Sequence, residues 1–155
     1  MKRDFSLLVI AALASGSIGI SACATRSLTS SGTGTSPNPA SDVFACIRQE
    51  IKNAGFSQES YDESELRVTA HLYNEKTRRP DVRFRRLIDR ISFDVDPASG
   101  TSTTTAVTAQ ASTFVELSTH RGPTEQQERT SETAKDAARS ILGRCAPTSA
   151  EPRKP

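Results

Sequence analysis

Apolar residues in the middle of the chain follow two different periods. From Phe44 to Ala54 they recur at the spacing of one helix face, and Gly55 is typical of a helix end. Over residues 66–73, apolar and polar side chains alternate one by one, which predicts a half-buried strand. The pattern therefore predicts a helix near the start of a folded domain, followed by a strand.

Two more strands are predicted further along the chain. Residues 82–95 alternate again, but the apolar parity changes near Arg85 or Arg86, which indicates a β-bulge. Asp89 interrupts the apolar face of this strand as a polar misfit. Residues 105–115 are rich in β-branched side chains, which favour strands. We expect these three strands to form an antiparallel meander.

A second helix is predicted to close the domain. Gly122 and Pro123 interrupt the strand pattern, and Thr124 and Gln127 have the spacing of a capping box. An alanine-rich apolar stripe then runs to Gly143. The predicted fold class is α+β, a two-layer sandwich in which both helices cover one face of a three-stranded antiparallel meander (α-β-β-β-α).

Composition divides the 155-residue chain into one domain and its flanking segments. Residues 24–41 are mostly Ser, Thr, Gly and Pro, so we expect residues 23–41 to form a flexible tether. Residues 42–145 hold the predicted elements and form a small α+β domain. Residues 146–155 have the composition of a disordered tail.

The first residues of the chain resemble an export signal. Two positive charges at Lys2 and Arg3 precede an apolar stretch that is too short and too rich in Gly and Ser to span a membrane well. The stretch ends in the tetrapeptide Ile20-Ser21-Ala22-Cys23. This tetrapeptide resembles the lipobox of bacterial lipoproteins, and the resemblance covers only the first 23 residues.

The resemblance implies that residues 1–22 are a lipoprotein signal peptide. Cleavage before Cys23 would be accompanied by a diacylglyceryl group on its thiol and by acylation, of the palmitate type, at the new amino terminus. Two or more chains anchor a protein stably in a membrane. Ala24 stands where an Asp would mark retention in the inner membrane of a Gram-negative cell, so the outer membrane is favoured. The alternative is an ordinary secretory signal with a chance cysteine.

Two cysteines are left once Cys23 carries lipid. In an oxidising compartment a pair is more often bridged than free, so we predict a disulfide between Cys46 and Cys145. The predicted meander opposes this pairing, because it places the two cysteines at opposite ends unless the loop before the last helix carries the chain back. The alternative is two buried thiols. Two cysteines and two distant histidines lack the spacing of zinc ligands, so we expect no metal and no cofactor.

The most distinctive charge pattern is basic. Residues 76–90 hold seven Lys and Arg against two Asp. Arginine matches the geometry of phosphate and carboxylate groups, so this segment predicts a surface for an anionic lipid, lipopolysaccharide or an acidic envelope protein. Its candidate residues are Arg78, Arg79, Arg83, Arg85, Arg86 and Arg90. The alternative is a solvated strand face balanced by the acidic residues of 59–65.

The charge balance and the motifs narrow the function classes. A net charge of +2 and the lack of aromatic residues interleaved with the arginines argue against a nucleic-acid partner. His71 and His120 are the two histidines, and neither lies in a known nucleophile or metal motif. We therefore expect a membrane-anchored, non-catalytic binding or assembly module of the cell envelope. The alternatives are a small hydrolase-like enzyme that uses His71 or His120, and a purely structural spacer.

Overall fold

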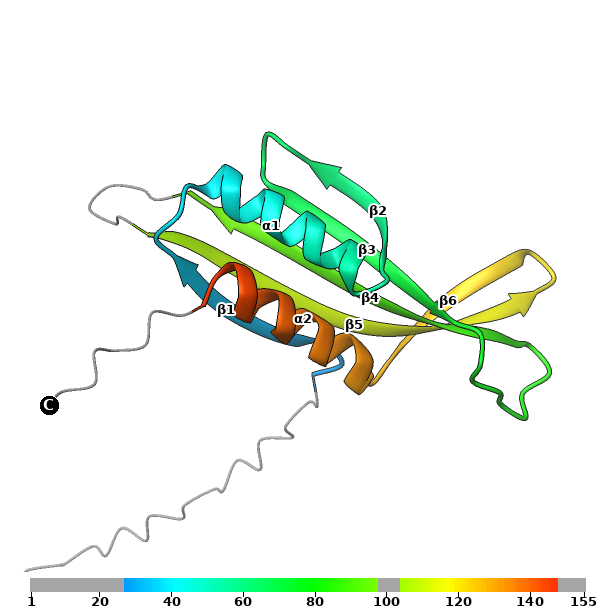
Figure 1. Cartoon of the computed structure of the whole chain (residues 1–155). Coiled ribbons are helices and arrows are strands. Elements are labelled where there is room, and N and C mark those ends of the chain that lie inside the picture. Colours follow the sequence, from blue (N-terminus) through cyan, green and yellow to red (C-terminus); the bar gives the residue numbers. More distant parts are fainter. Residues whose placement is uncertain (1–26, 98–103, 148–155) are drawn as a thin grey trace, which may run out of the picture.

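The computed structural model describes residues 27–97 and 104–147 (Figure 1). The predicted signal peptide, Cys23 and most of the predicted tail lie outside the described residues. The elements in chain order are β1 (Ser30–Ser36), α1 (Ala40–Asn53), β2 (Ser57–Asp62), β3 (Arg67–Asn74), β4 (Phe84–Asp96), β5 (Thr105–Thr119), β6 (Gly122–Glu128) and α2 (Glu132–Cys145).

Within the described residues, all strands belong to one six-stranded antiparallel sheet. Its order is β1-β5-β4-β3-β2, and β6 also pairs with β5. β1 pairs with Thr105 to Ala111 of β5, whereas β6 pairs with Thr113 to Thr119. Because β4 occupies the other side of β5, β1 and β6 share the same edge of β5, one after the other.

The predicted three-stranded meander is therefore wrong, because the sheet has six strands. The three predicted strands correspond to β3, β4 and β5, and a register shift lies between Phe84 and Arg86, where the change of parity predicted a bulge. β1, β2 and β6 were missed because they are edge strands with mostly polar, solvent-facing side chains. Backbone pairing holds such strands without an alternating apolar pattern.

Two element boundaries also differ from the prediction. Residues 30–36, expected in the tether, form β1. Thr124, expected at a helix start, pairs with Leu117 in the β5–β6 hairpin. The second helix instead begins after Ser131, whose side-chain oxygen accepts a hydrogen bond of 3.0 Å from the backbone N–H of Ala134. Ser131 thus provides the N-cap that the sequence suggested at Thr124.

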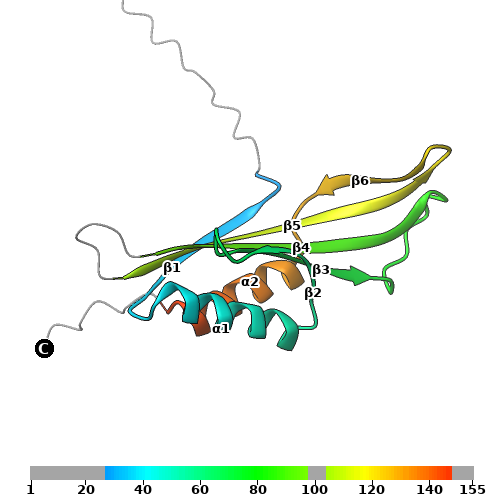
Figure 2. The same ribbon diagram turned by 90° about the horizontal axis from the view of Figure 1, so that it is seen from above.

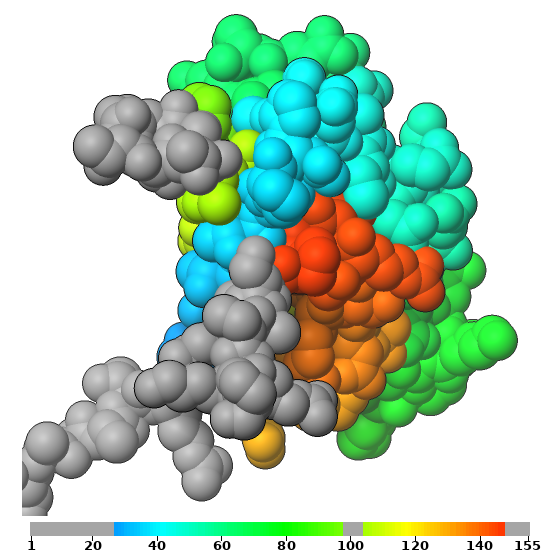
Figure 3. Space-filling view, turned by 60° about the vertical axis from the view of Figure 1, so that its left-hand side comes forward, coloured from blue at the N-terminus to red at the C-terminus, as the bar shows by residue number. Residues whose placement is uncertain are grey.

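Both helices pack on the same face of the sheet (Figures 1 and 2), and α1 lies against α2 (Figure 3). The core between the layers is aliphatic and aromatic. It includes Ile47 and Ile51 of α1, Ile91 and Phe93 of β4, and Ile141 of α2. β4 and β5 are the longest strands, with 13 and 15 residues, and together with β6 they extend past the helices (Figure 2).

A disulfide joins the two helices. Cys46 of α1 and Cys145 of α2 are bonded, with their Cα atoms 5.8 Å apart and a sequence separation of 99. The predicted meander opposed this pairing, but in the structure the β5–β6 hairpin reverses the chain before α2 begins. α2 continues in the direction of β6 and runs antiparallel to α1 (Figure 1). The end of α2 therefore reaches the first half of α1.

Candidate functional site

The face of the sheet opposite the helices is open, and its central residues form three rows across the strands. Tyr73, Ile88 and Phe114 occupy one row, because Tyr73 pairs with Ile88 and Ile88 pairs with Phe114. On one side lies the row of His71, Arg90 and Ser112, and on the other lies the pair of Arg86 and Glu116. We call these eight residues the open-face cluster.

Arginines of the open-face cluster stack on its aromatic rings. The guanidinium carbon of Arg86 lies 3.6 Å from the ring centre of Tyr73, and that of Arg90 lies 4.7 Å from the ring centre of Phe114. Ile88 sits between the two rings and is only 3% exposed. Cation–π contacts of this kind hold the planar guanidinium groups in fixed orientations.

Glutamates form ion pairs with the arginines of the cluster. Nε of Arg90 donates to Glu59 at 2.9 Å, and its Nη1 donates to Glu125 at 3.2 Å. Burial lowers the pKa of Arg90, but the hydrogen bonds to these two carboxylates outweigh burial and raise it overall. Arg90 is therefore a permanent cation, held in place by neighbours from β2 and β6.

Glu116 is the buried acid of the open face. It is 6% exposed and binds both Arg85, at 3.1 Å, and Arg86. A carboxylate this deeply buried needs such partners, because burying an unpaired charge is costly. Glu116 and Glu125 were not singled out from the sequence, whereas Glu59 is one of the acidic residues of 59–65 named there as a possible balance for the basic segment. They lie far along the chain from the arginines they bind, and only the strand register brings them together.

The six arginines predicted as an anion surface lie in three places, and Arg86 belongs to two of them, the open-face cluster and the hollow described next. Arg90 lies in the open-face cluster. Four others surround a hollow of about 460 Å³ at the extended end of the sheet, together with Glu75 and Phe84; they are Arg78, Arg79, Arg85 and Arg86. Arg83 lies on the loop before β4, where it pairs with Asp81 at 3.1 Å.

Carboxylates contact five of these six arginines. Arg79 forms a two-pronged pair with Glu128, with 2.6 Å between Nη2 and Oε2. In the part of the chain that the structure describes, Arg78 is the exception, because it donates only to the backbone carbonyls of Glu75 and Thr77. An external anion would therefore have to compete with internal acids at most of this surface.

The two histidines lie far apart. His71 contacts the Tyr73 ring, with 4.5 Å between ring centres, and its Nδ1 is 3.9 Å from Glu59. His120 lies in the turn between β5 and β6, eight residues beyond the Ser112 that shares the row of His71. An extended strand covers roughly 26 Å over that interval. The structure therefore does not bring the two candidate catalytic histidines together.

Asp89, the polar misfit of the predicted strand, anchors α2 to the sheet. It is 2% exposed, and its Oδ1 accepts hydrogen bonds from the hydroxyls of Thr113, at 2.6 Å, and Ser131, at 2.7 Å. The backbone N–H of Ser131 donates in turn to the Thr113 hydroxyl at 2.9 Å. A carboxylate at a helix N-terminus is electrostatically favoured, so the misfit has a structural role.

No group of three or more potential metal ligands is found in residues 27–97 and 104–147. Within those same ranges, no helix is long and apolar enough to cross a membrane. No protein-family model matches the chain, and a search of curated proteins finds no significant match.

Proposed function

We propose that this protein is a lipid-anchored, non-catalytic module of the cell envelope that binds a partner protein through the open-face cluster. The lipobox-like tetrapeptide ending at Cys23 supports the anchor. The disulfide between Cys46 and Cys145 supports an oxidising compartment, because such bonds are rare in reducing ones.

The observation that carries the binding role is the stacking of Arg86 and Arg90 on Tyr73 and Phe114. Tyr, Phe and Arg are enriched in the parts of protein surfaces that bind other proteins. Their stacking lowers the entropy cost of binding, because the side chains are already ordered.

The partner's chemistry follows from the mixed charge of the cluster. Glu59, Glu116 and Glu125 already neutralise its arginines, so a simple anion gains little there. A protein surface can offer an apolar contact to the rings together with acids and hydrogen-bond donors in one arrangement. An envelope protein with a partly apolar patch of mixed charge therefore fits this face better than a lipid headgroup does.

A second candidate function is binding of an anionic lipid or lipopolysaccharide at the arginine hollow. Arg78 favours it, because no described carboxylate contacts this side chain. Arg78 lies at the extended end of the sheet, away from Arg90, so variants of the two sites separate the two candidates.

The binding role is tested by photo-crosslinking in intact cells. A photoreactive amino acid replaces Gln110, which is exposed on the open face next to the cluster, and in a control strain it replaces Asp136, which is exposed on α2. We expect one adduct of defined protein mass from position 110 and none from 136. Arg90→Ser is expected to weaken binding about tenfold or more, because centrally placed arginines carry much of the energy of an interface. Equal adducts from both positions, or insensitivity to Arg90→Ser, would contradict the proposal.

The anchor is tested by intact mass spectrometry of protein extracted from membranes. We expect an amino terminus at Cys23 with the added mass of acyl chains, and we expect Cys46 and Cys145 to react with an alkylating agent only after reduction. Cys23→Ser should abolish the acyl mass. A soluble, unacylated chain would show that the lipobox interpretation is wrong.

A further inference from the structure

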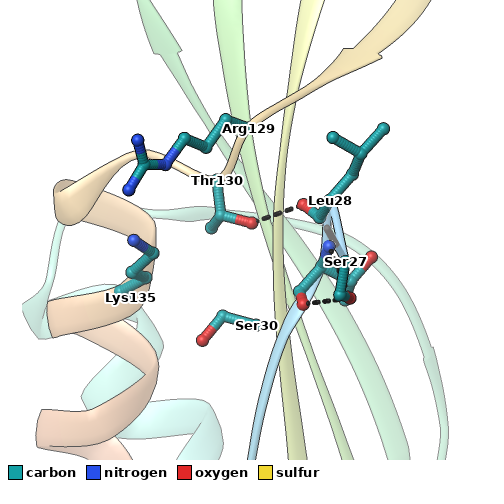
Figure 4. A pocket seen from close by; sticks show the side chains of 7 residues that line it. Ser27, Leu28, Ser30, Arg129, Thr130 and Lys135 are labelled. Atoms are coloured by element: carbon teal, nitrogen blue, oxygen red, sulfur yellow. Dashed lines mark hydrogen bonds between the residues drawn. The ribbon is translucent and has the colours of Figure 1, made fainter. Parts of the chain in front are cut away.

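A hollow of about 540 Å³ lies where the chain enters the sheet (Figure 4). One wall is formed by residues 27–30, and the other by Arg129 and Thr130, which link β6 to α2, and by Lys135 of α2. The side chains of Arg129 and Lys135 lie on the same side of the hollow, across from Leu28 and Ser30 (Figure 4).

Hydrogen bonds fix the wall that precedes β1. The Thr130 hydroxyl donates to the carbonyl of Leu28 at 2.6 Å, and the side-chain amide of Gln127 donates to the Thr29 hydroxyl at 3.0 Å. The segment before β1 is thus held against the link between β6 and α2. The point at which the chain leaves the sheet toward Cys23 is therefore fixed.

The hollow combines positive charge with an exposed apolar side chain. Arg129 is exposed and forms no ion pair within 4 Å among the described residues, but it interacts electrostatically with Glu132, which Lys135 binds at 2.8 Å. Leu28, across the hollow from the two cations, is 43% exposed and is one of few large apolar side chains that face solvent in the described ranges. Cations next to an exposed apolar group suit a membrane surface, where phosphate groups lie above acyl chains.

The length of the intervening chain limits how far this hollow can lie from the anchor. Cys23 precedes Ser27 by four residues, and four extended residues span at most about 14 Å. If Cys23 carries lipid, as the proposed function requires, the hollow lies at the bilayer surface and the extended end of the sheet lies farther from it.

We propose that the hollow formed by Leu28, Ser30, Arg129 and Lys135 binds the phosphate of an anionic phospholipid headgroup and seats the domain on the membrane. This inference rests on the lipid anchor of the proposed function. In this role Arg129 and Lys135 bind the phosphate oxygens, the Ser30 hydroxyl is within the same hollow, and Leu28 contacts the interfacial region.

The test uses the mature lipidated protein in vesicles. A fluorophore is attached at Thr133→Cys, an exposed position on α2 beside the hollow; the native cysteines cannot react because Cys23 is acylated and the other two are bridged. Quenching by headgroup-labelled lipid is compared between vesicles of phosphatidylcholine and vesicles that also contain phosphatidylglycerol. We expect stronger quenching with phosphatidylglycerol.

The double variant Arg129→Ser/Lys135→Ser should lose this lipid dependence. Each cation removed is expected to shift the balance between the seated and detached domain about fivefold. Lys52→Ser/Arg121→Ser removes the same charge from exposed positions elsewhere and should keep the dependence.

Each outcome of the test has a distinct meaning. Absence of the acyl mass at Cys23 would remove the anchor and with it the proposed function. An acylated protein whose quenching is the same in both lipids, or whose two double variants behave alike, would overturn the headgroup site alone. Equal changes caused by inorganic phosphate in phosphatidylcholine vesicles would show a free-anion site and would also overturn it.

Discussion

Asp89 illustrates how one residue can look like an error in a sequence pattern and still determine the packing. The alternation of β4 marked it as a polar side chain on the apolar face. The structure places it beneath the start of α2, where two hydroxyls donate to it. The sequence could identify the anomaly but not its partners, because Thr113 and Ser131 are 24 and 42 positions away.

Asp89 supports a first prediction at this scale. Asp89→Ala should lower the free energy of unfolding by about 2–3 kcal/mol, because the hydroxyls of Thr113 and Ser131 would lose a buried charged acceptor. Asp89→Asn should cost less, since it keeps an acceptor oxygen and the shape of the side chain. Chemical denaturation measures the free energy of unfolding of both variants. An Asp89→Ala protein that unfolds at the same denaturant concentration as the wild type would refute the structural role.

Two glycines of β1 provide a second prediction, with a built-in control. A Cβ at Gly34 would collide with the backbone carbonyl oxygen of Ala146 and approach Leu142, so Gly34→Ala should destabilise the domain by about 1–3 kcal/mol. A Cβ at Gly32 would meet Leu142 at 3.5 Å, an ordinary contact, so Gly32→Ala should change stability by less than about 0.5 kcal/mol. Thermal unfolding of both variants should show this difference, and equal effects would contradict the close packing of β1 on α2.

At the scale of elements, the sequence predicted those whose apolar side chains face the core. α1, β3, β4 and β5 each carry a regular apolar stripe, and each prediction falls on the correct segment. The edge strands carry no such signal. In β1, only Gly34 and Ser36 are buried, and both are residues that composition assigns to a tether.

The candidate site was predictable only in part for a related reason. The arginines of residues 76–90 were found as a charge pattern, but their glutamate partners come from β2, β5 and β6. Register across strands decides whether a basic segment becomes a basic surface. In this protein it produces a nearly neutral network around two aromatic rings, which composition alone could not show.

The molecule as a whole should lose stability in acid. Glu50, Asp62, Asp81 and Glu132 have pKa values below their ordinary 3.8 to 4.5, because hydrogen bonds favour their charged forms; the donors are Arg144, Ser64, Arg83 and Lys135 respectively. A carboxyl group whose pKa is lower in the folded than in the unfolded protein stabilises the fold at pH values above its unfolded pKa. This stabilisation is lost as the pH falls through the pKa of the folded state.

We therefore expect the thermal midpoint to decline as the pH drops below about 4.5. The decline should be smaller in high salt, because Asp62, Asp81 and Glu132 are exposed and salt screens such pairs. Calorimetry across this range measures both effects. A midpoint that rises on acidification would contradict the assignment.

The position of β1 has a consequence for how the domain can be divided. A chain that begins at Asp42, where composition places the domain boundary, would leave Thr105 to Ala111 of β5 as a bare edge. Unpaired edges recruit strands from other molecules. The shortened protein would be an acceptor for donor-strand complementation, and a peptide of residues 27–36 supplied separately would be its natural donor. The segment that the composition assigns to a tether is thus the strand that covers this edge of β5 and prevents it from pairing with other molecules.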